Sequence, residues 1–242
     1  MNATATRRDF LKQGSIGGLA LWLNGTDLLG LGQDSETFAH GDGVTNWRDA
    51  SGQGNHFKYS QGNPSYVANA RNGKGAVNFD GDDVMWGDGN FDSLTANGYT
   101  ILSVARYTGG DNQRAITSRT RNWFFGFHNN GTTRFHANGW ILNQGPNDTS
   151  WHLHVGAHEK IGGDPRAWFW KDGILVADGL TGSNNTVFAP GQLQLGAYWN
   201  DARETSKAEI AEILLFNREL LYDEREKAEG YLAHKWGFSL PD

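Results

Sequence analysis

Three aspartates gather in a short turn in the first half of the chain. Asp80, Asp82 and Asp83 surround a glycine and lie between two apolar stretches. Loops that present carboxylate oxygens are typical calcium ligands, so this turn is a candidate calcium site. Asn200 or Asp201, in a later polar segment, would supply a further ligand. The alternative is that Asp-Gly-Asp is ordinary turn chemistry, because both residue types are favoured in turns.

Tryptophan is the second residue type that could carry function, because its flat apolar face can stack on a sugar ring. Trp168 and Trp170 lie two apart and so share one face of a predicted strand, while Phe169 takes the other. At least one of these two indoles should therefore be accessible to solvent. Further candidates for ligand binding are Trp123, Trp140, Trp199 and Asn200. The alternative for each tryptophan is the core, which large aromatic side chains usually fill in a sandwich.

Histidines raise the question of a metal site. His152 and His154 lie two apart on one predicted strand face, and His158 follows further along. A zinc site needs a third and a fourth converging ligand, and none can be placed from the sequence. The pattern favours a polar strand face, with Trp151 and Leu153 pointing the other way.

The elements that must position these side chains are short strands. Apolar or alternating runs, separated by clusters of Gly, Asn and Asp, predict successive antiparallel strands joined by turns. Residues 24–46 and 50–74 are polar and too long for tight turns, so we expect loops over the rims of a sandwich. The clearest predicted strands are residues 75–79, 99–106, 122–128, 151–158, 166–171, 192–197 and 209–216.

A helical pattern occurs only at the end of the chain. Acidic residues follow Tyr222 in what would be the first turn, where they complement the helix dipole. Leu232 and Trp236 then fall on one face at spacing four, and Gly237 is a stop signal. We expect a helix over residues 222–236 that packs across the outside of the sandwich.

Composition limits the class of protein. The 242 residues include 33 Gly, 13 Phe and 10 Trp against 2 Met, a pattern that fits short strands and aromatic packing in one all-β domain. The net charge is −6 and the basic residues are scattered, so nucleic acid is not an expected partner. Cysteine is absent, which excludes disulfides and thiolate metal sites.

The N-terminal segment has the pattern of an export signal. The run from Thr6 to Lys12 contains Arg7-Arg8 followed by Phe10-Leu11, and small and apolar residues come next. Residues 1–18 therefore resemble a twin-arginine signal and predict secretion or display at a bacterial surface. The alternative is a basic arm that stays attached. Apolar runs stay well below the ~20 residues that cross a bilayer, so we expect no transmembrane segment.

Several motifs occur in an order and spacing that together are specific. They resemble the laminin G-like members of the concanavalin A-like lectin and glucanase superfamily, in the form common in bacterial surface proteins. The resemblance covers roughly residues 19–240, nearly the whole chain. The motifs are Leu21-Trp22-Leu23, residues 44–55 (VTNWRDASGQGN), 76–83 (AVNFDGDD), 168–173 (WFWKDG), 210–218 (IAEILLFNR) and 224–237 (EREKAEGYLAHKWG).

The resemblance implies a jelly-roll sandwich of two curved antiparallel sheets in a domain of residues 19–242. Calcium at a rim is common in this superfamily, in line with the aspartate turn. The chain departs from the family at the helix start, where Leu220-Leu221-Tyr222 offers no Ser or Thr cap.

Catalysis is not expected. The Glu-x-Asp-x-Glu strand of the family's hydrolases and the signatures of related polysaccharide lyases are missing. The nearest acid pair on a predicted strand is Glu209 and Glu212, whose spacing of three places them on opposite faces.

Three functions follow in order of preference. The first is a non-catalytic extracellular carbohydrate-binding or adhesion module, lectin-like, that uses rim loops and an aromatic patch on the concave sheet. The second is a structural or protein-interaction domain in a cell-surface or extracellular assembly, which would show a large apolar patch outside any groove. The third is a glycoside hydrolase or polysaccharide lyase with unfamiliar residues, which paired carboxylates about 5–10 Å apart in a cleft would support.

Overall fold

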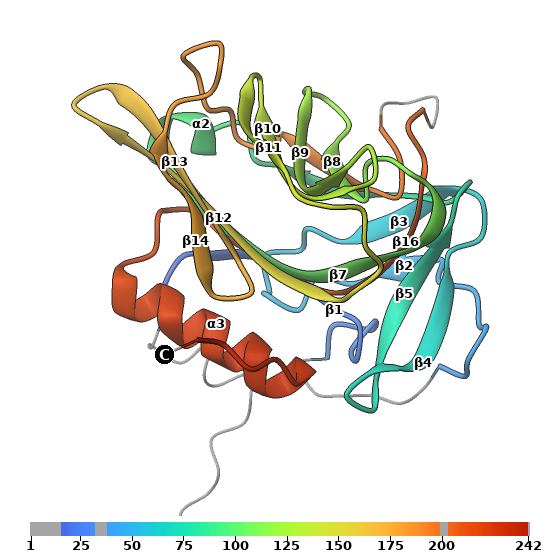
Figure 1. Ribbon diagram of the computed structural model, residues 1–242. Coiled ribbons are helices and arrows are strands. Elements are labelled where there is room, and N and C mark those ends of the chain that lie inside the picture. The colour runs from blue at the N-terminus through green and yellow to red at the C-terminus, as the bar shows by residue number, and fades with distance from the viewer. Residues whose placement is uncertain (1–15, 32–37, 199–202, 242) are drawn as a thin grey trace, which may run out of the picture.

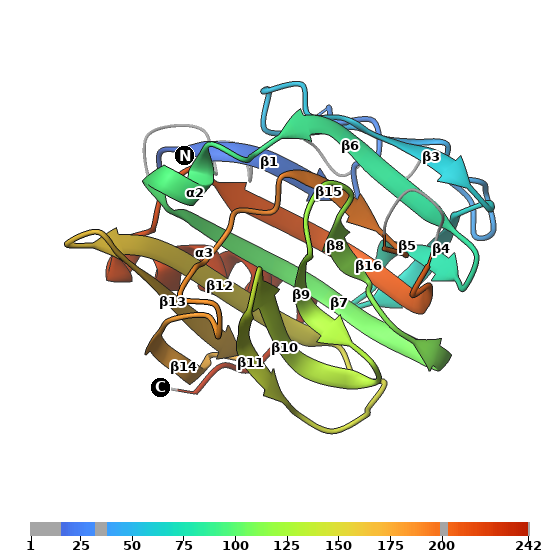
Figure 2. The ribbon, with the colours of Figure 1, turned by 90° about the horizontal axis from the view of Figure 1, so that it is seen from above.

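Two stacked antiparallel sheets form the molecule. The computed structural model describes residues 16–31, 38–198 and 203–241, and within these ranges the strands form two eight-stranded sheets, called sheet A and sheet B here. The long strands of sheet A bow around sheet B (Figure 1), and sheet B lies in front when the molecule is viewed from above (Figure 2). The predicted two-sheet antiparallel sandwich with a C-terminal helix is confirmed.

The strand order of each sheet mixes segments that are far apart in the sequence. Sheet A runs β14 (Ile174–Leu180), β13 (Asp164–Lys171), β12 (His152–Ile161), β7 (Tyr99–Asn112), β16 (Ser206–Phe216), β5 (Lys74–Asp80) and β4 (Ser65–Arg71), and β1 (Leu19–Asn24) also pairs with β16. Sheet B runs β11 (Trp140–Gln144), β10 (Gly131–Ala137), β9 (Trp123–His128), β8 (Ile116–Ser118), β15 (Gln192–Leu195), β6 (Val84–Asn90), β3 (Phe57–Gln61) and β2 (Asn46–Trp47). The helices within the described ranges are α2 (Leu94–Asn97) and α3 (Tyr222–Trp236).

All seven clearest predicted strands are present, but the expected loop over residues 50–74 is wrong. It contains all of β3 and β4, which are strands near the sheet margins. In β3 only Phe57 is buried and the next four residues are exposed. A strand that is solvated over most of its length carries little apolar pattern, so its polar residues resemble a loop in the sequence.

The core between the sheets is aromatic. Trp123, Phe125 and Phe127 of β9 alternate inward, and they meet Phe135 of β10 and Phe169 of β13. All five side chains are fully buried. Such burial is the main favourable term for a chain that has no disulfide to hold it.

Helix α3 covers the outer face of sheet A, on the side away from sheet B (Figure 1). It spans the predicted range, and Gly237 closes it in the left-handed conformation with φ 68°. The carboxylate of Glu224 accepts a hydrogen bond from the backbone N–H of Leu221 (3.0 Å) and binds the guanidinium of Arg218 through two bonds of 2.7 Å. This carboxylate does part of the work of the missing Ser or Thr cap.

A buried polar network fixes α3 to sheet A. The Nζ of Lys235 lies 2.7 Å from Glu212 Oε2, and both side chains are almost fully buried. Glu212 also accepts hydrogen bonds from the indole N–H groups of Trp22 and Trp236, each 2.7 Å, and from the hydroxyl of Tyr231 at 2.9 Å. These bonds compensate for the removal of two charges from water. Neither described helix is both long and apolar enough to cross a membrane.

Candidate functional site

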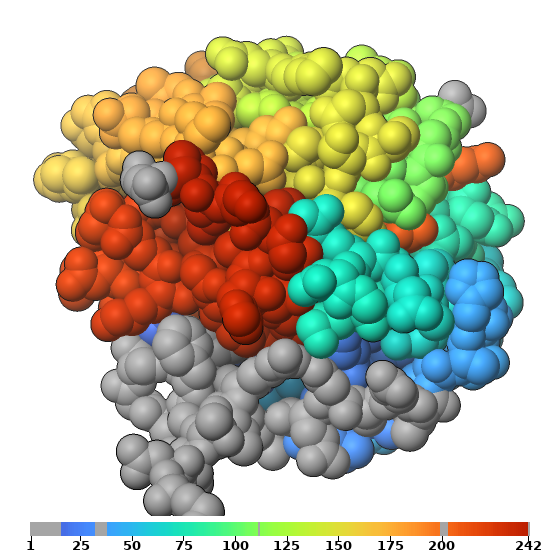
Figure 3. All heavy atoms as spheres, turned by 60° about the horizontal axis from the view of Figure 1, so that its bottom comes forward, coloured from blue at the N-terminus to red at the C-terminus, as the bar shows by residue number. Residues whose placement is uncertain are grey.

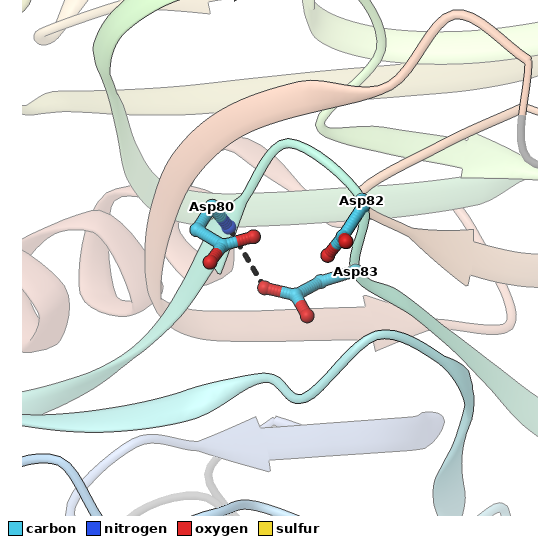
Figure 4. A group of neighbouring side chains, drawn as sticks. All are labelled: Asp80, Asp82 and Asp83. Atoms are coloured by element: carbon cyan, nitrogen blue, oxygen red, sulfur yellow. Dashed lines mark hydrogen bonds between the residues drawn. The ribbon is translucent and has the colours of Figure 1, made fainter.

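The predicted aspartate turn exists and joins β5 to β6 (Figure 4). Carboxylate oxygens of Asp80, Asp82 and Asp83 lie within 4.8 Å of one another. Asp83 is buried and accepts hydrogen bonds from the backbone N–H groups of Asp80 (2.8 Å) and Asn63 (2.5 Å). Its carboxylate therefore braces this turn against the neighbouring loop, whether or not a cation is bound.

Burial is the main influence on the protonation of Asp83. It raises the pKa of this carboxyl to about 6, partly opposed by the two backbone hydrogen bonds. The further predicted ligands Asp201 and Asn200 lie outside the described residues, as does Trp199. Calcium at the turn stays a prediction.

A pocket of about 350 Å³ opens between the outer face of sheet A and the first turn of α3. Trp168 and Trp170 of β13 line it, because Phe169 between them points into the core. Both indoles are half-buried, so the expected accessibility of the face opposite Phe169 is met. Figure 3 shows α3 lying beside the segment that contains β13 and β14 on this face of the molecule. We call this cavity the tryptophan pocket.

Side chains of α3 and β14 complete the apolar lining of the tryptophan pocket. Tyr222 is 66% exposed and Leu175 is 45% exposed. The guanidinium carbon of Arg225 lies 4.5 Å from the ring centroid of Trp170 and 5.2 Å from that of Tyr222. Arg225 is therefore held between two rings, and cation–π attraction fixes one wall.

Carboxylates supply the polar groups of the pocket. Asp178 Oδ1 accepts a hydrogen bond from Trp168 Nε1 at 3.1 Å, which orients this indole. Glu219, in the link between β16 and α3, lines the pocket and hydrogen-bonds to the side chain of Glu159. Burial, and to a smaller extent the contact with Glu159, raise the pKa of Glu219 to about 7. The pocket thus presents aromatic faces beside hydrogen-bond acceptors.

Trp140 lies on the other side of the molecule, on the outer face of sheet B. It pairs with His136 of β10, which pairs with Phe124 of β9. Its ring centroid lies 5.3 Å from those of Phe124 and His136 and 5.7 Å from that of His128. Trp140 and the pair Trp168 and Trp170 therefore cannot form one site. The two β13 indoles also lie on the helix-covered face, not on the concave sheet face that we expected.

Cations lie over two aromatic rings of sheet B, those of Phe124 and Trp86, and over the nearby Tyr198. Arg114 lies 4.5 Å from the ring of Phe124 and 3.8 Å from that of Tyr198. Lys58 and Arg119 lie 4.6 and 4.2 Å from the ring of Trp86. Trp123, the remaining tryptophan named above, is fully buried.

The expectation that Glu209 and Glu212 point to opposite faces is wrong. The pairing of β16 with β7 shifts register between Ile210 and Glu212, as a bulge does. Both carboxylates consequently lie on the outer face of sheet A, where each has a cation. Glu209 bonds Arg106 at 3.0 and 3.1 Å, and Glu212 bonds Lys235. They serve as structural ion pairs.

The strand histidines point toward the interior, with Trp151 and Leu153 on the opposite face as expected. His154 is fully buried and its Nε2 donates to the carbonyl of Thr132 at 2.8 Å. His152 lies between Asp148 and Asp172, at 2.9 and 2.8 Å. All three histidines are buried on this polar strand face, and each ring is held by protein acceptors.

Sequence reasoning missed several residues of the tryptophan pocket. Tyr222 and Arg225 were assigned only to the helix start, although their spacing of three places both on the side that faces β13. Glu219 and Glu159 are 60 positions apart in the sequence, and nothing local indicates that they meet. Asp178 lies in β14, and the sequence of this strand shows no clear apolar alternation that would have predicted it.

The fold and this geometry define a two-sheet β-sandwich with an aromatic pocket on one outer face. No family model matches the chain, and no curated protein matches it in sequence. Solved structures with this fold do match. One is domain 4 of AbnA, a GH43 extracellular arabinanase from Geobacillus stearothermophilus, in complex with arabinotriose. It has 13% identity and a TM-score of 0.53, over 77% of this chain and 97% of that one.

Two further similar structures belong to larger proteins. The binding domain of botulinum neurotoxin DC, in complex with SialylT, matches over 92% of this chain and 55% of its own, with 12% identity and a TM-score of 0.58. Trypanosoma rangeli sialidase matches over 91% of this chain and 33% of its own, with 11% identity and a TM-score of 0.56. The chain thus spans about a third of that enzyme. At these identities the likeness shows the fold alone.

Proposed function

We propose that this protein is a non-catalytic carbohydrate-binding domain that holds its glycan in the tryptophan pocket. The observation that carries the proposal is the lining of this pocket. Two half-buried indoles and an exposed tyrosine stand beside carboxylates in a space of about 350 Å³, within the size range of ligand sites. Sugar rings offer apolar C–H faces to aromatic rings and hydroxyl donors to carboxylate acceptors.

The carboxyl geometry supports binding over hydrolysis. Glycosidases keep their two carboxyl groups roughly 5–10 Å apart, so that sugar or water fits between them. Glu219 instead lies against Glu159, and Asp178 accepts a hydrogen bond from the indole of Trp168, so each of these carboxyl groups already has a protein partner. Similar structures with sugars in their names, such as the arabinanase domain with arabinotriose, are in keeping with the proposal.

The test is a glycan array followed by calorimetry with the best-bound oligosaccharide. We expect Trp168→Ala and Tyr222→Ala each to weaken binding at least about tenfold, since each removes a stacking surface. Trp151→Ala is the matched control, because Trp151 is half-buried on the same face of sheet A but does not line the pocket. Equal affinity in all variants, or silence across a broad array, would overturn the proposal.

We further infer a laminin G-like domain that is exported to the bacterial surface or secreted. Support comes from the ordered motifs over residues 19–240 and from the twin-arginine pattern of residues 6–12, which lies outside the described residues. Replacing both Arg7 and Arg8 by lysine in the full chain should abolish export through the twin-arginine route in a bacterial host. Unchanged export of that variant would contradict the assignment.

A second candidate is a protein-interaction domain, and one observation favours it. Large exposed apolar side chains concentrate near the edge of sheet A and the start of α3. If glycans do not bind, Leu175→Lys should abolish any self-association seen by sedimentation velocity, and Tyr59→Lys on sheet B should not. The side chains concerned are Ile161, Ile174, Leu175, Leu180, Leu221 and Tyr222.

A further inference from the structure

The tryptophan pocket has more acidic than basic groups at its surface. Asp178 and Glu219 line it, and Glu159 is bonded to Glu219. Among the described residues, Arg225 is the one cation in the lining, and it is already paired with the buried Glu229 and held between two rings. The positive charge of Arg225 is therefore largely compensated by groups of the protein itself.

Other cations close to these acids are also engaged. Arg166 is the cross-strand neighbour of Glu159, but its guanidinium reaches the carbonyl of Gly179 at 3.3 Å and does not line the pocket. Arg218 binds Glu224 through two hydrogen bonds of 2.7 Å. The pocket surface consequently keeps an excess of negative charge.

Glu219 lines the pocket, and the side chain of Glu159 lies within hydrogen-bonding reach of it. Two carboxyl groups can form a hydrogen bond only when one of them holds a proton, because two carboxylates repel at this range. A positive ligand group beside them would favour loss of that proton, because its charge would offset the repulsion between the two carboxylates. Aromatic walls strengthen the preference, since the face of a tryptophan or tyrosine ring attracts a cation.

We propose that the tryptophan pocket selects saccharides that carry a protonated amine, such as units of a deacetylated hexosamine polymer, over neutral and carboxylated sugars. The inference rests on the proposed function and refines it. The amine would lie near Asp178 and Glu219, while the sugar ring stacks on the indoles. Uronic and other carboxylated sugars are disfavoured, because their charge would meet the same carboxylates.

Calorimetry with three matched oligomers tests this selection: glucosamine tetramer, its fully N-acetylated form and galacturonic acid tetramer. At pH 6.5 and low salt we expect the amine form to bind about tenfold more tightly than the acetylated form, and the acid form not to bind. The preference should shrink at 0.5 M salt, because salt screens charge at a partly exposed site.

Two charge variants separate selectivity from binding. Asp178→Asn and Glu219→Gln should each lower affinity for the amine form about five- to tenfold and leave the acetylated form within about twofold. Asp164→Asn is the control, because Asp164 is exposed on β13 but does not line the pocket. Circular dichroism and unfolding curves of each variant exclude loss of fold as a cause.

The outcomes distinguish the two proposals. Equal or tighter binding of the acetylated form, or an equal loss for both forms in Asp178→Asn, would overturn the amine selection and leave the carbohydrate-binding function intact. Retained binding of all oligomers in Trp168→Ala would instead place the saccharide elsewhere and overturn both.

Discussion

At the scale of single residues, we expect mutation of the buried pair of Lys235 and Glu212 to destabilise the protein strongly. Both side chains are almost fully buried, and Glu212 accepts from three further donors. Lys235→Met removes one charge and leaves the other without its partner. We expect the free energy of unfolding to fall by about 3–5 kcal/mol in urea titrations followed by tryptophan fluorescence.

A double variant and a surface control check the cause of that loss. Lys235→Met combined with Glu212→Gln should recover a part of the stability, because no uncompensated charge remains buried. Lys227→Met, on an exposed position of α3, should change stability by less than about 0.5 kcal/mol. If Lys235→Met behaves like Lys227→Met, the ion pair contributes nothing.

Asp83 gives a second residue-scale prediction, which also tests calcium. Its pKa is raised to about 6 in the folded state, above the ordinary 3.8, so the folded state binds the proton more tightly. This contribution to stability is complete below about pH 4 and is lost as the pH rises through 6. Asp83→Asn should flatten that part of the curve of urea midpoint against pH.

Calcium should reverse this behaviour if it binds the aspartate turn. A bound cation favours the ionised carboxylates, so the unfolding temperature at pH 7 should rise with calcium and fall back with chelator. Asp82→Asn should remove that rise, because it takes one carboxylate from the cluster. The turn itself should stay intact, because Asp82 is exposed and Asp83 makes the bracing hydrogen bonds. An unfolding temperature that does not respond to calcium in the wild-type protein would contradict the predicted site.

At the scale of elements, the start of α3 is open to improvement. Leu221 occupies the N-cap position with extended backbone angles, is 71% exposed and has no side-chain acceptor. Leu221→Ser would add the missing acceptor while Glu224 keeps its bond to the backbone of residue 221. We expect a gain of about 0.5–1 kcal/mol in the free energy of unfolding.

Leu221→Ala is the matched control for this change, because it removes the same exposed apolar group without adding a cap. It should not stabilise the protein. A gain of the same size in both variants would show that the loss of the exposed leucine, and not capping, is responsible.

At the scale of the whole molecule, groups with opposite shifts set the dependence of stability on pH. Burial raises the pKa values of Glu219 and Glu229 to about 7, so the folded state binds their protons more tightly than the unfolded chain. That stabilisation is lost as the pH rises through 7. Burial lowers the pKa of His154 to about 3 and also lowers those of His128, His136 and His158.

The histidines act in the other direction. They stay neutral in the folded state while the unfolded chain takes up protons below about 6.5, so stability falls as the pH drops below that value. We expect urea midpoints measured between pH 5 and 8.5 to peak close to neutrality. Glu229→Gln should flatten the alkaline limb only, and a midpoint that rises steadily up to pH 8.5 would contradict this assignment.

Local pattern was sufficient for much of the architecture. Alternating apolar residues in β7, β9, β13 and β16 indicated strands that are buried on at least one face, and the acids, apolar spacing and Gly237 of α3 indicated its range. Strands near the sheet margins such as β3 and β4 were missed, because β3 is exposed over most of its length and β4 has only one fully buried residue, so neither shows an apolar pattern.

The sequence by itself determined the antiparallel strands, the C-terminal helix, and the division of β13 into Phe169 inside and two tryptophans outside, because these follow from turn residues and from periods of 2 and 3.6 residues. The arrangement in two sheets was implied by the resemblance of its ordered motifs. Only the tertiary structure decided which tryptophans share a surface. Trp140 lies on sheet B, away from Trp168 and Trp170 on sheet A. The bulge in β16 places Glu209 and Glu212 on the same face of sheet A. Glu159, Glu219 and Arg225 met only through sheet pairing and helix docking, which depend on contacts between distant segments that no local spacing records.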